Sequence, residues 1–169
     1  AVRALAGNGA DLELRTPAGV TPLALAILES KYKAAIALID AGAEVETSDG
    51  DAKLTPLMLI AGSEDRELTL GAGVSRIQKV NPGDPGPLEL ARALIAKGAK
   101  VNDVSSTGVT ALLLAAAHNN APIVGLLVQA GADRNFKSPQ GLTAEDLAKS
   151  NGNTAVVSLL NLLTQAGSN

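Results

Sequence analysis

The sequence predicts an all-α fold, a solenoid in which short helix-turn-helix units stack side by side and are joined by tight turns. The first observation is a threonine followed by a mostly apolar run, which occurs four times, at Thr21, Thr55, Thr110 and Thr143. The second is a Gly-Ala ending, which occurs at Gly9, Gly42, Gly98 and Gly131. The first and last intervals between the threonines are each roughly 33 residues, a period that indicates units that must stack, because one unit alone cannot bury its apolar face.

The first helix of each unit is predicted to begin at its threonine. In the second unit, Thr21 is a suitable N-cap, and Pro22 occupies the first helical position, where its missing N–H costs nothing. The polar residues 29–31 end this helix. The side chains expected to face inward are those of Leu23, Leu25, Ala26 and Ile27.

The second helix of that unit is predicted to run through about Ala41. Gly42 then supplies the left-handed residue that ends it, and the other Gly-Ala endings predict the same stop in their units. Each ending is followed by a polar stretch that contains glycine, at residues 16–19, 48–51, 105–108 and 138–141. These stretches predict the tight turns that join consecutive units.

The third unit contains an insertion, because the interval from Thr55 to Thr110 is longer than the regular one. Removal of residues 64–85 restores the period, and a second helix is then predicted from Pro87 to Gly98. The segment is too apolar for a solvated linker, with Leu68, Leu70, Val74, Ile77 and Val80. We expect it to pack on the first-helix side of the array, with a hairpin near residues 71–73. Whether it is a decoration of its own unit or a wall of the binding surface stays open.

The whole chain, residues 1–169, is predicted to be one domain. Its units are about 1–19, 20–53, 54–108, 109–141 and 142–169, and residues 1–8 supply only the second helix of the first. The last unit is expected to be a cap, because a terminal unit needs a polar outer face. Glu145, Asp146 and Lys149 place charge on its first helix. Its inward stripe is expected to be Leu159, Leu160, Leu162 and Leu163.

This pattern resembles the ankyrin repeat, which runs from a glycine turn through Thr-Pro-Leu-His-x-Ala to a Gly-Ala-Asp-x-Asn ending. The likeness is strongest at residues 19–46 and 108–135, and it includes the closing Asn102 and Asn135. The usual histidine is absent, since the residues at its position are Ala24, Met58, Leu113 and Asp146. The resemblance implies a non-enzymatic scaffold that binds another protein through its turn tips and the concave face of its first helices.

The composition excludes several other classes of function. The net charge of −3 and the pI of about 5.1 argue against a nucleic-acid partner, which requires clustered lysine and arginine. Cysteine is absent, so disulfides and thiolate metal sites are excluded. No apolar run approaches the roughly 18 residues that span a membrane, and we expect no membrane insertion. The Ala-rich and Gly-rich, Cys-free composition leans toward a bacterial source, with the chain soluble in the cytoplasm or exported to the periplasm.

Catalytic and metal sites are not predicted. Glu29, Ser63 and His118 occupy the same position in three consecutive units, which suggests a triad. Stacked helices are about 8–10 Å apart, however, and a nucleophile and its base must approach to about 2.6–3.2 Å. The carboxylates at residues 64–67 match no metal loop, and the glycines at 71–73 lack the lysine of a phosphate loop. We therefore expect no catalytic residue, metal or cofactor.

Candidate contacts with a partner protein lie in three places. At the turn tips they are Asp49, Asp51, Thr107 and Gln140; along the inner helix ends, Glu29, Ser63 and His118; in the insertion, Arg66, Arg76 and Lys79. One alternative is small-molecule or substrate binding in a pocket between the insertion and the first-helix face. Another is a structural or self-associating subunit that uses the incomplete first unit. Of these, we favour a chain that is monomeric on its own and binds a protein partner.

Overall fold

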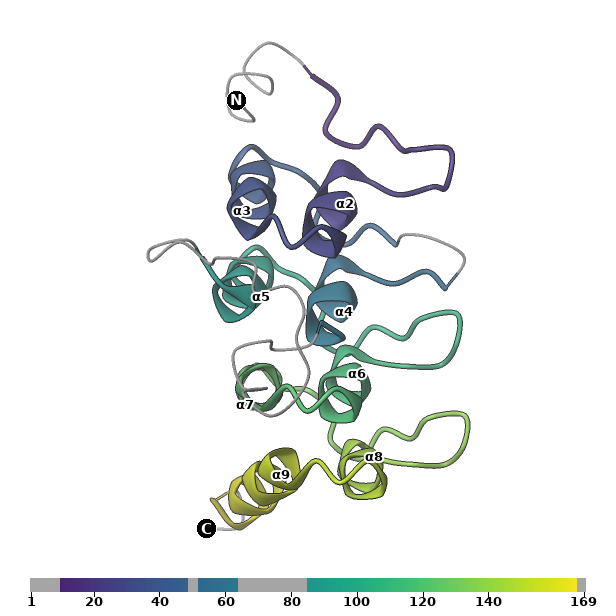
Figure 1. The fold of residues 1–169 in the computed structure, drawn as a ribbon, viewed down its shortest axis with the longest axis vertical. Coiled ribbons are helices and arrows are strands. Elements are labelled where there is room, and N and C mark those ends of the chain that lie inside the picture. The colour runs from purple at the N-terminus through teal and green to yellow at the C-terminus, as the bar shows by residue number, and fades with distance from the viewer. Residues whose placement is uncertain (1–9, 49–51, 64–84, 167–169) are drawn as a thin grey trace, which may run out of the picture.

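Eight helices form two parallel columns in the computed structural model, which describes residues 10–48, 52–63 and 85–166. The first column contains α2 (Pro22–Leu28), α4 (Pro56–Ala61), α6 (Ala111–Ala117) and α8 (Ala144–Ser150). The second contains α3 (Tyr32–Asp40), α5 (Pro87–Ala96), α7 (Ala121–Gln129) and α9 (Thr154–Ala166). Within these residues there is no strand, and the predicted all-α solenoid is confirmed (Figure 1). The half-unit at residues 1–8 and the hairpin near 71–73 lie outside the described residues.

Each helix of the first column begins at its threonine, as predicted. The hydroxyl oxygen of Thr21 accepts a hydrogen bond from the backbone N–H of Ala24 at 3.2 Å. Thr55, Thr110 and Thr143 cap α4, α6 and α8 in the same way. The caps satisfy donors that would otherwise lack a partner at the start of each short helix. They therefore fix where every unit begins.

The predicted inward face of α2 was wrong at one residue. Leu25 is 44% exposed, whereas Ala24 is fully buried. An α-helix has 3.6 residues per turn, so Leu23, Ala24 and Ile27 share one face of α2, and Leu25 lies on the opposite face. Burial in α2 therefore follows helical spacing and not side-chain size.

The second helices end where the Gly-Ala pattern predicts. Gly42, Gly98 and Gly131 have φ of +98°, +95° and +90°, in the left-handed region that favours glycine. The alanine that follows each glycine is buried. The helix from Pro87 to about Gly98 is also confirmed, because α5 is Pro87–Ala96 and Lys97 is its C-cap.

A ladder of hydrogen bonds joins the loops that follow the second helices. Except in the last unit, the side chain of the closing residue accepts the backbone N–H of a residue in the next loop: Glu13 accepts that of Glu44 at 2.9 Å, and Asn102 accepts that of Asp133 at 2.8 Å. Both pairs are 31 residues apart in sequence. Asn102 also donates its amide to the carbonyl of Gly131 at 3.0 Å. We call this the closing ladder.

The closing ladder is unbroken where the chain contains the insertion. Glu46 accepts the backbone N–H of Lys100 at 2.7 Å across a sequence separation of 54 residues, and its second oxygen lies 3.6 Å from the Lys100 ammonium. The second and third units are therefore stacked as closely as units that follow one another directly.

A second set of bonds joins the units at the junctions between their helices. Asn120, which is 1% exposed, donates its side-chain amide to the carbonyl of Ser63 at 3.0 Å. Asn153, at the same position in the next unit, donates to the carbonyls of Ala116 and Ala117 at 2.7 and 3.0 Å. Both amides satisfy carbonyls at the C-terminal end of the preceding first-column helix, which have no partner within the helix.

The last unit carries the charged first helix that was predicted for a cap. Thr143 and Asp146 form a reciprocal capping box, and Lys149 lies 2.6 Å from Glu145 one turn away. The predicted inward stripe of α9 is correct for Leu160, which is 1% exposed, and wrong for Leu162, which is 64% exposed. Leu162 lies two residues from Leu160 and hence on nearly the opposite side of the helix.

The capping box makes the stability of the last unit depend on pH. The Thr143 hydroxyl and backbone N–H both donate to the Asp146 carboxylate, at 2.7 and 3.0 Å, and hold its pKa below the ordinary value. Folding thus favours the charged carboxylate, so its stabilisation is complete above the unfolded pKa and is lost as the pH falls through the folded pKa.

We expect Asp146→Asn to lower the melting temperature by about 2 °C at pH 7, because it weakens the helix cap. The difference from the unmodified chain should shrink as the pH falls below about 4 and through the lowered pKa of the folded chain, because Asp146 then becomes protonated. Thermal unfolding followed by circular dichroism across this pH range would measure it. Melting curves that differ by the same amount at every pH would contradict the role assigned to the carboxylate.

Candidate functional site

The first-column helices each have a leucine at one fixed position that is exposed or half-buried. Counted from the capping threonine as the first residue, the fifth residues are Leu25, Leu59, Leu114 and Leu147. Leu25 is 44% exposed and the other three are half-buried. They are not among the fully buried residues of α2, α4, α6 and α8, and Leu59, Leu114 and Leu147 pack partly against the core. We call this row the leucine ridge.

The residues beside the leucine ridge lie at the C-terminal ends of the first-column helices. At the eighth and ninth positions, counted from the capping threonine as the first, they are Leu28 and Glu29, Gly62 and Ser63, Ala117 and His118, and Ser150 and Asn151. Glu29 is the only Asp, Glu, Lys or Arg in this set. Leu28 is 58% exposed and lies one turn from Leu25, so the ridge is widest at α2. The face therefore combines a row of leucines with small and polar side chains, and it has few charged residues.

Neighbouring units meet closely along the ridge. A Cβ added at Gly62 would lie 3.9 Å from the Leu114 Cβ, which shows that Leu114 reaches back from α6 over the end of α4. α4 itself packs between α2 and α6, and α6 between α4 and α8 (Figure 1). The ridge is therefore close-packed where α4 and α6 meet.

The three residues predicted at the inner helix ends lie on this face. Glu29 and His118 are exposed C-caps of α2 and α6, and Ser63 follows the C-cap of α4. Ser63 is engaged locally, because its hydroxyl donates to the Ile60 carbonyl at 2.6 Å. No hydrogen bond or ion pair connects the three side chains in the described structure, as the spacing of stacked helices requires.

The turn tips form the edge of this face. Gly19, Gly108 and Gly141 close the turns with φ of +73°, +76° and +79°. Thr107 and Gln140 are exposed there, and the Thr107 hydroxyl oxygen lies 2.9 Å from that of Ser105. The candidates Asp49, Asp51, Arg66, Arg76 and Lys79 lie outside the described residues and stay predictions.

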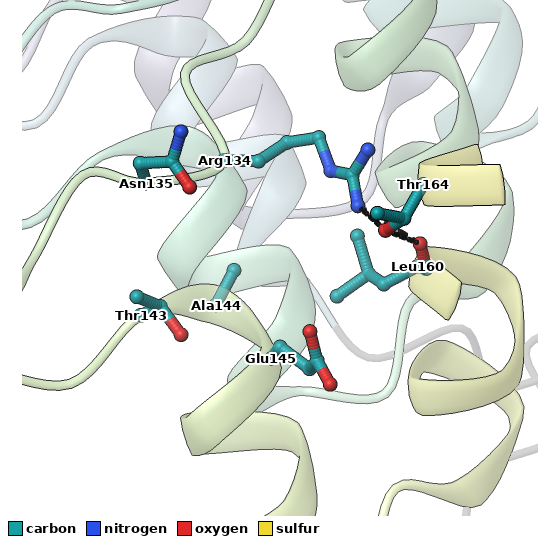
Figure 2. Close-up of a pocket in the computed structure, with 7 residues that line it drawn as sticks. All are labelled: Arg134, Asn135, Thr143, Ala144, Glu145, Leu160 and Thr164. Carbon is teal, nitrogen blue, oxygen red and sulfur yellow. Dashed lines mark hydrogen bonds between the residues drawn. The ribbon is translucent and has the colours of Figure 1, made fainter. Parts of the chain in front are cut away.

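Two hollows in the described residues are lined by none of the ridge leucines. One, of about 340 Å³, lies at the C-terminal end between α8, α9 and the loop before α8 (Figure 2). The other, of about 790 Å³, is an open hollow between the first turn and Ser48 and Lys53. Among the residues described, no three acidic or histidine side chains form a metal-binding group. None of the helices in these ranges is long and apolar enough to cross a membrane.

The stacked helix pairs, their threonine caps and their left-handed glycines define the chain as a helical repeat protein. Residues 83–166 match the family model for ankyrin repeats, described as three copies. The chain is an ankyrin-repeat protein. A comparison with curated proteins gave no match. Ankyrin repeats are generally protein–protein interaction modules, and the family is typically non-enzymatic.

Sequence reasoning identified the helix ends of this face but not its central row. Leu25 was assigned to the interior, and Leu59, Leu114 and Leu147 were not considered as contacts. The signal was present in the sequence, because all four leucines lie at one fixed distance from their threonine. Leu14 and Val104, at 71% and 49% exposure, are further exposed apolar residues in the loops that the sequence did not mark.

Proposed function

We propose that this chain is a non-enzymatic scaffold that binds a partner protein through the leucine ridge, with the turn tips as a second line of contact. The observation that carries the proposal is a row of exposed or half-buried leucines across four units, beside which few side chains are charged. Depletion of charge is what distinguishes the core of a protein interface from the rest of a surface. Contiguous exposed apolar residues rimmed by polar ones are likewise typical of interaction sites.

Rigidity of the face favours binding further. The helices that carry the ridge are capped at one end by threonine. At the other end Asn120 binds the carbonyl of Ser63 just after α4, and Asn153 binds carbonyls of α6. The leucine side chains are thus held at fixed positions before a partner arrives. Little conformational entropy is then lost on association, which raises affinity for a given contact area.

The spacing of the ridge favours an amphipathic helix as the partner segment. Stacked helices lie about 8–10 Å apart, so an apolar residue is offered at about this interval. A helix rises about 1.5 Å per residue and therefore returns an apolar residue to one face every seven residues, or about 10.5 Å. Helices that dock in apolar grooves are a common mode of peptide recognition.

The two alternative functions have less support. A small-molecule site calls for a closed apolar pocket with a few convergent polar groups. Neither of the two cavities noted above lies on the leucine ridge. Self-association through the first unit concerns residues outside the described ones, and we propose that the chain is monomeric on its own. A monomeric mass at high concentration would support this.

We expect the double substitution Leu25→Ser and Leu28→Ser to weaken partner binding at least tenfold, because buried apolar anchors carry most of the energy of an interface. Both side chains are exposed, so the melting temperature should change little. Proteins retained on the immobilised chain can be identified by mass spectrometry, and the affinity of the chief one measured by calorimetry.

Leu162→Ser is the matched control, because Leu162 is exposed on α9 in the other column. It should retain the same proteins as the unmodified chain. Partner binding by a chain without residues 64–85 shows whether the insertion contributes in addition to the ridge. If the ridge variant binds as well as the control, the leucine ridge is not the recognition surface.

A further inference from the structure

The closing ladder ends at Asn135. This residue holds the same position in its unit as Asn102 does in the preceding one, but its side chain has a different environment. Asn102 binds the loop of the next unit with both atoms of its amide: its oxygen accepts the Asp133 N–H at 2.8 Å and its nitrogen donates to the Gly131 carbonyl at 3.0 Å. Asn135 holds the same position one unit later and is exposed. Its amide is bonded to no described residue.

The reason is the length of the last helix. α3, α5 and α7 have 9, 10 and 9 residues, whereas α9 has 13. In the preceding units a left-handed glycine stops the helix and turns the chain so that a backbone N–H faces the closing residue. In the last unit, Thr164 stands at the position of that glycine and is still helical. No loop within the described residues presents its backbone to Asn135.

A cavity occupies the space beside Asn135. Its volume is about 340 Å³, and its lining is Arg134, Asn135, Thr143, Ala144, Glu145, Leu160 and Thr164. Figure 2 shows Arg134 extending to Leu160 and Thr164 of α9, with Asn135 on the opposite side of the cavity. The cavity therefore offers the amide of Asn135 at one side and a guanidinium at the other.

The charge of the cavity favours an acidic ligand. The Arg134 guanidinium donates to the Leu160 carbonyl at 2.9 Å and to the Thr164 hydroxyl, but no carboxylate of the described residues is paired with it. Its Nε is buried without a partner. Glu145 also lines the cavity, and its charge is offset by Lys149 at 2.6 Å. Carboxylates are the ligands that a guanidinium binds best.

We propose that this cavity is a second peptide-binding site, which takes an acidic segment of a partner chain with a left-handed glycine turn like that at Gly131. Asn135 accepts a backbone N–H and donates to a backbone carbonyl two residues earlier, as Asn102 does with Asp133 and Gly131. Arg134 binds the acidic side chain of the segment. The site is separate from the leucine ridge, and its occupation does not depend on the function proposed for the ridge.

The test uses the tripeptide acetyl-Gly-Ala-Asp-amide, which has the sequence that Asn102 binds within the chain. Titration into the isotope-labelled protein, followed by NMR, should give saturable shifts at Thr143, Glu145 and Leu160 in the millimolar range. A peptide N-methylated at Asp lacks the N–H and should bind at least tenfold more weakly. Asn in place of the peptide Asp should weaken binding several-fold, and more so at low salt, because the guanidinium loses its carboxylate.

Two variants complete the experiment. Asn135→Ala should bind at least tenfold more weakly without loss of fold, because the exposed amide makes no bond within the described structure. Asn161→Ala, at an exposed asparagine of α9 that does not line the cavity, should bind as the unmodified chain does.

The proposal is overturned if no shift occurs, if the N-methylated peptide binds equally well, or if Asn135→Ala is without effect. A chain that ends at Ala166 tests whether the chain's own last residues, and not a partner segment, occupy the site. If the shifts appear only in that shortened chain, the chain's own last residues fill the site, and a partner segment does not.

Discussion

Replacement of Leu112 by alanine is expected to lower the free energy of unfolding by about 3 kcal/mol. Leu112 is 2% exposed and lies on α6, which packs between α4 and α8 in the middle of the array. The substitution removes apolar atoms that contact neighbouring units and leaves a cavity that short capped helices cannot readily close. Urea denaturation followed by circular dichroism would measure the change.

Leu162→Ala provides the matched control, since it removes the same atoms from a side chain that is 64% exposed. We expect it to change the free energy of unfolding by less than about 0.5 kcal/mol. Because each unit contacts only its neighbours, a weakened middle unit can also separate the two halves of the array. Equal losses at Leu112 and Leu162 would be incompatible with the core described above.

Replacement of Asn120 by alanine is expected to lower the free energy of unfolding by about 2 kcal/mol. The side chain caps α7 by accepting the Ile123 N–H at 3.4 Å, and it donates to the Ser63 carbonyl at 3.0 Å. Loss of a cap costs about 1 kcal/mol, and an inner carbonyl left without a partner costs about as much again. Chemical denaturation would measure the sum, and amide exchange would show whether α4 and α6 loosen.

Asn119→Gly tests whether the loss of unfolding free energy is specific to Asn120. Asn119 is exposed and has φ of +57°, a conformation that glycine adopts more readily. Its replacement should leave stability unchanged or raise it by a few tenths of a kcal/mol. A loss at Asn119 as large as that at Asn120 would show that the junction is generally intolerant, and would leave the bond to Ser63 without a special role.

The fold was predictable because its signals are local. Thr21 caps α2 through a hydrogen bond to a residue three positions away, and Gly42 ends α3 through its own backbone angle. Such features depend on a few adjacent residues, so they can be recognised in the sequence. Leu25 was misassigned because hydrophobicity was given more weight than helical spacing, although Ala24 and Ile27 are the residues in register with Leu23.

The contacts between units were not predictable in the same way. The partners of Asn120 and Asn153 are backbone carbonyls, which no sequence pattern marks. The second unit has Lys31 at the equivalent position, so the asparagine does not recur in every unit. The environment of Asn135 likewise depends on how far α9 continues, and therefore on tertiary packing against Arg134.

The bond between Glu46 and Lys100 also bears on how this chain can diverge. The third unit, in which residues 64–84 come between α4 and α5 in sequence, is held to the second by the same kind of bond as units without an insertion. Ser63 at one edge is bound to the following unit by Asn120. Length and composition can therefore vary between Ser63 and Pro85 without altering the register of the helices. Related chains could acquire new partners at this position while they keep the leucine ridge unchanged.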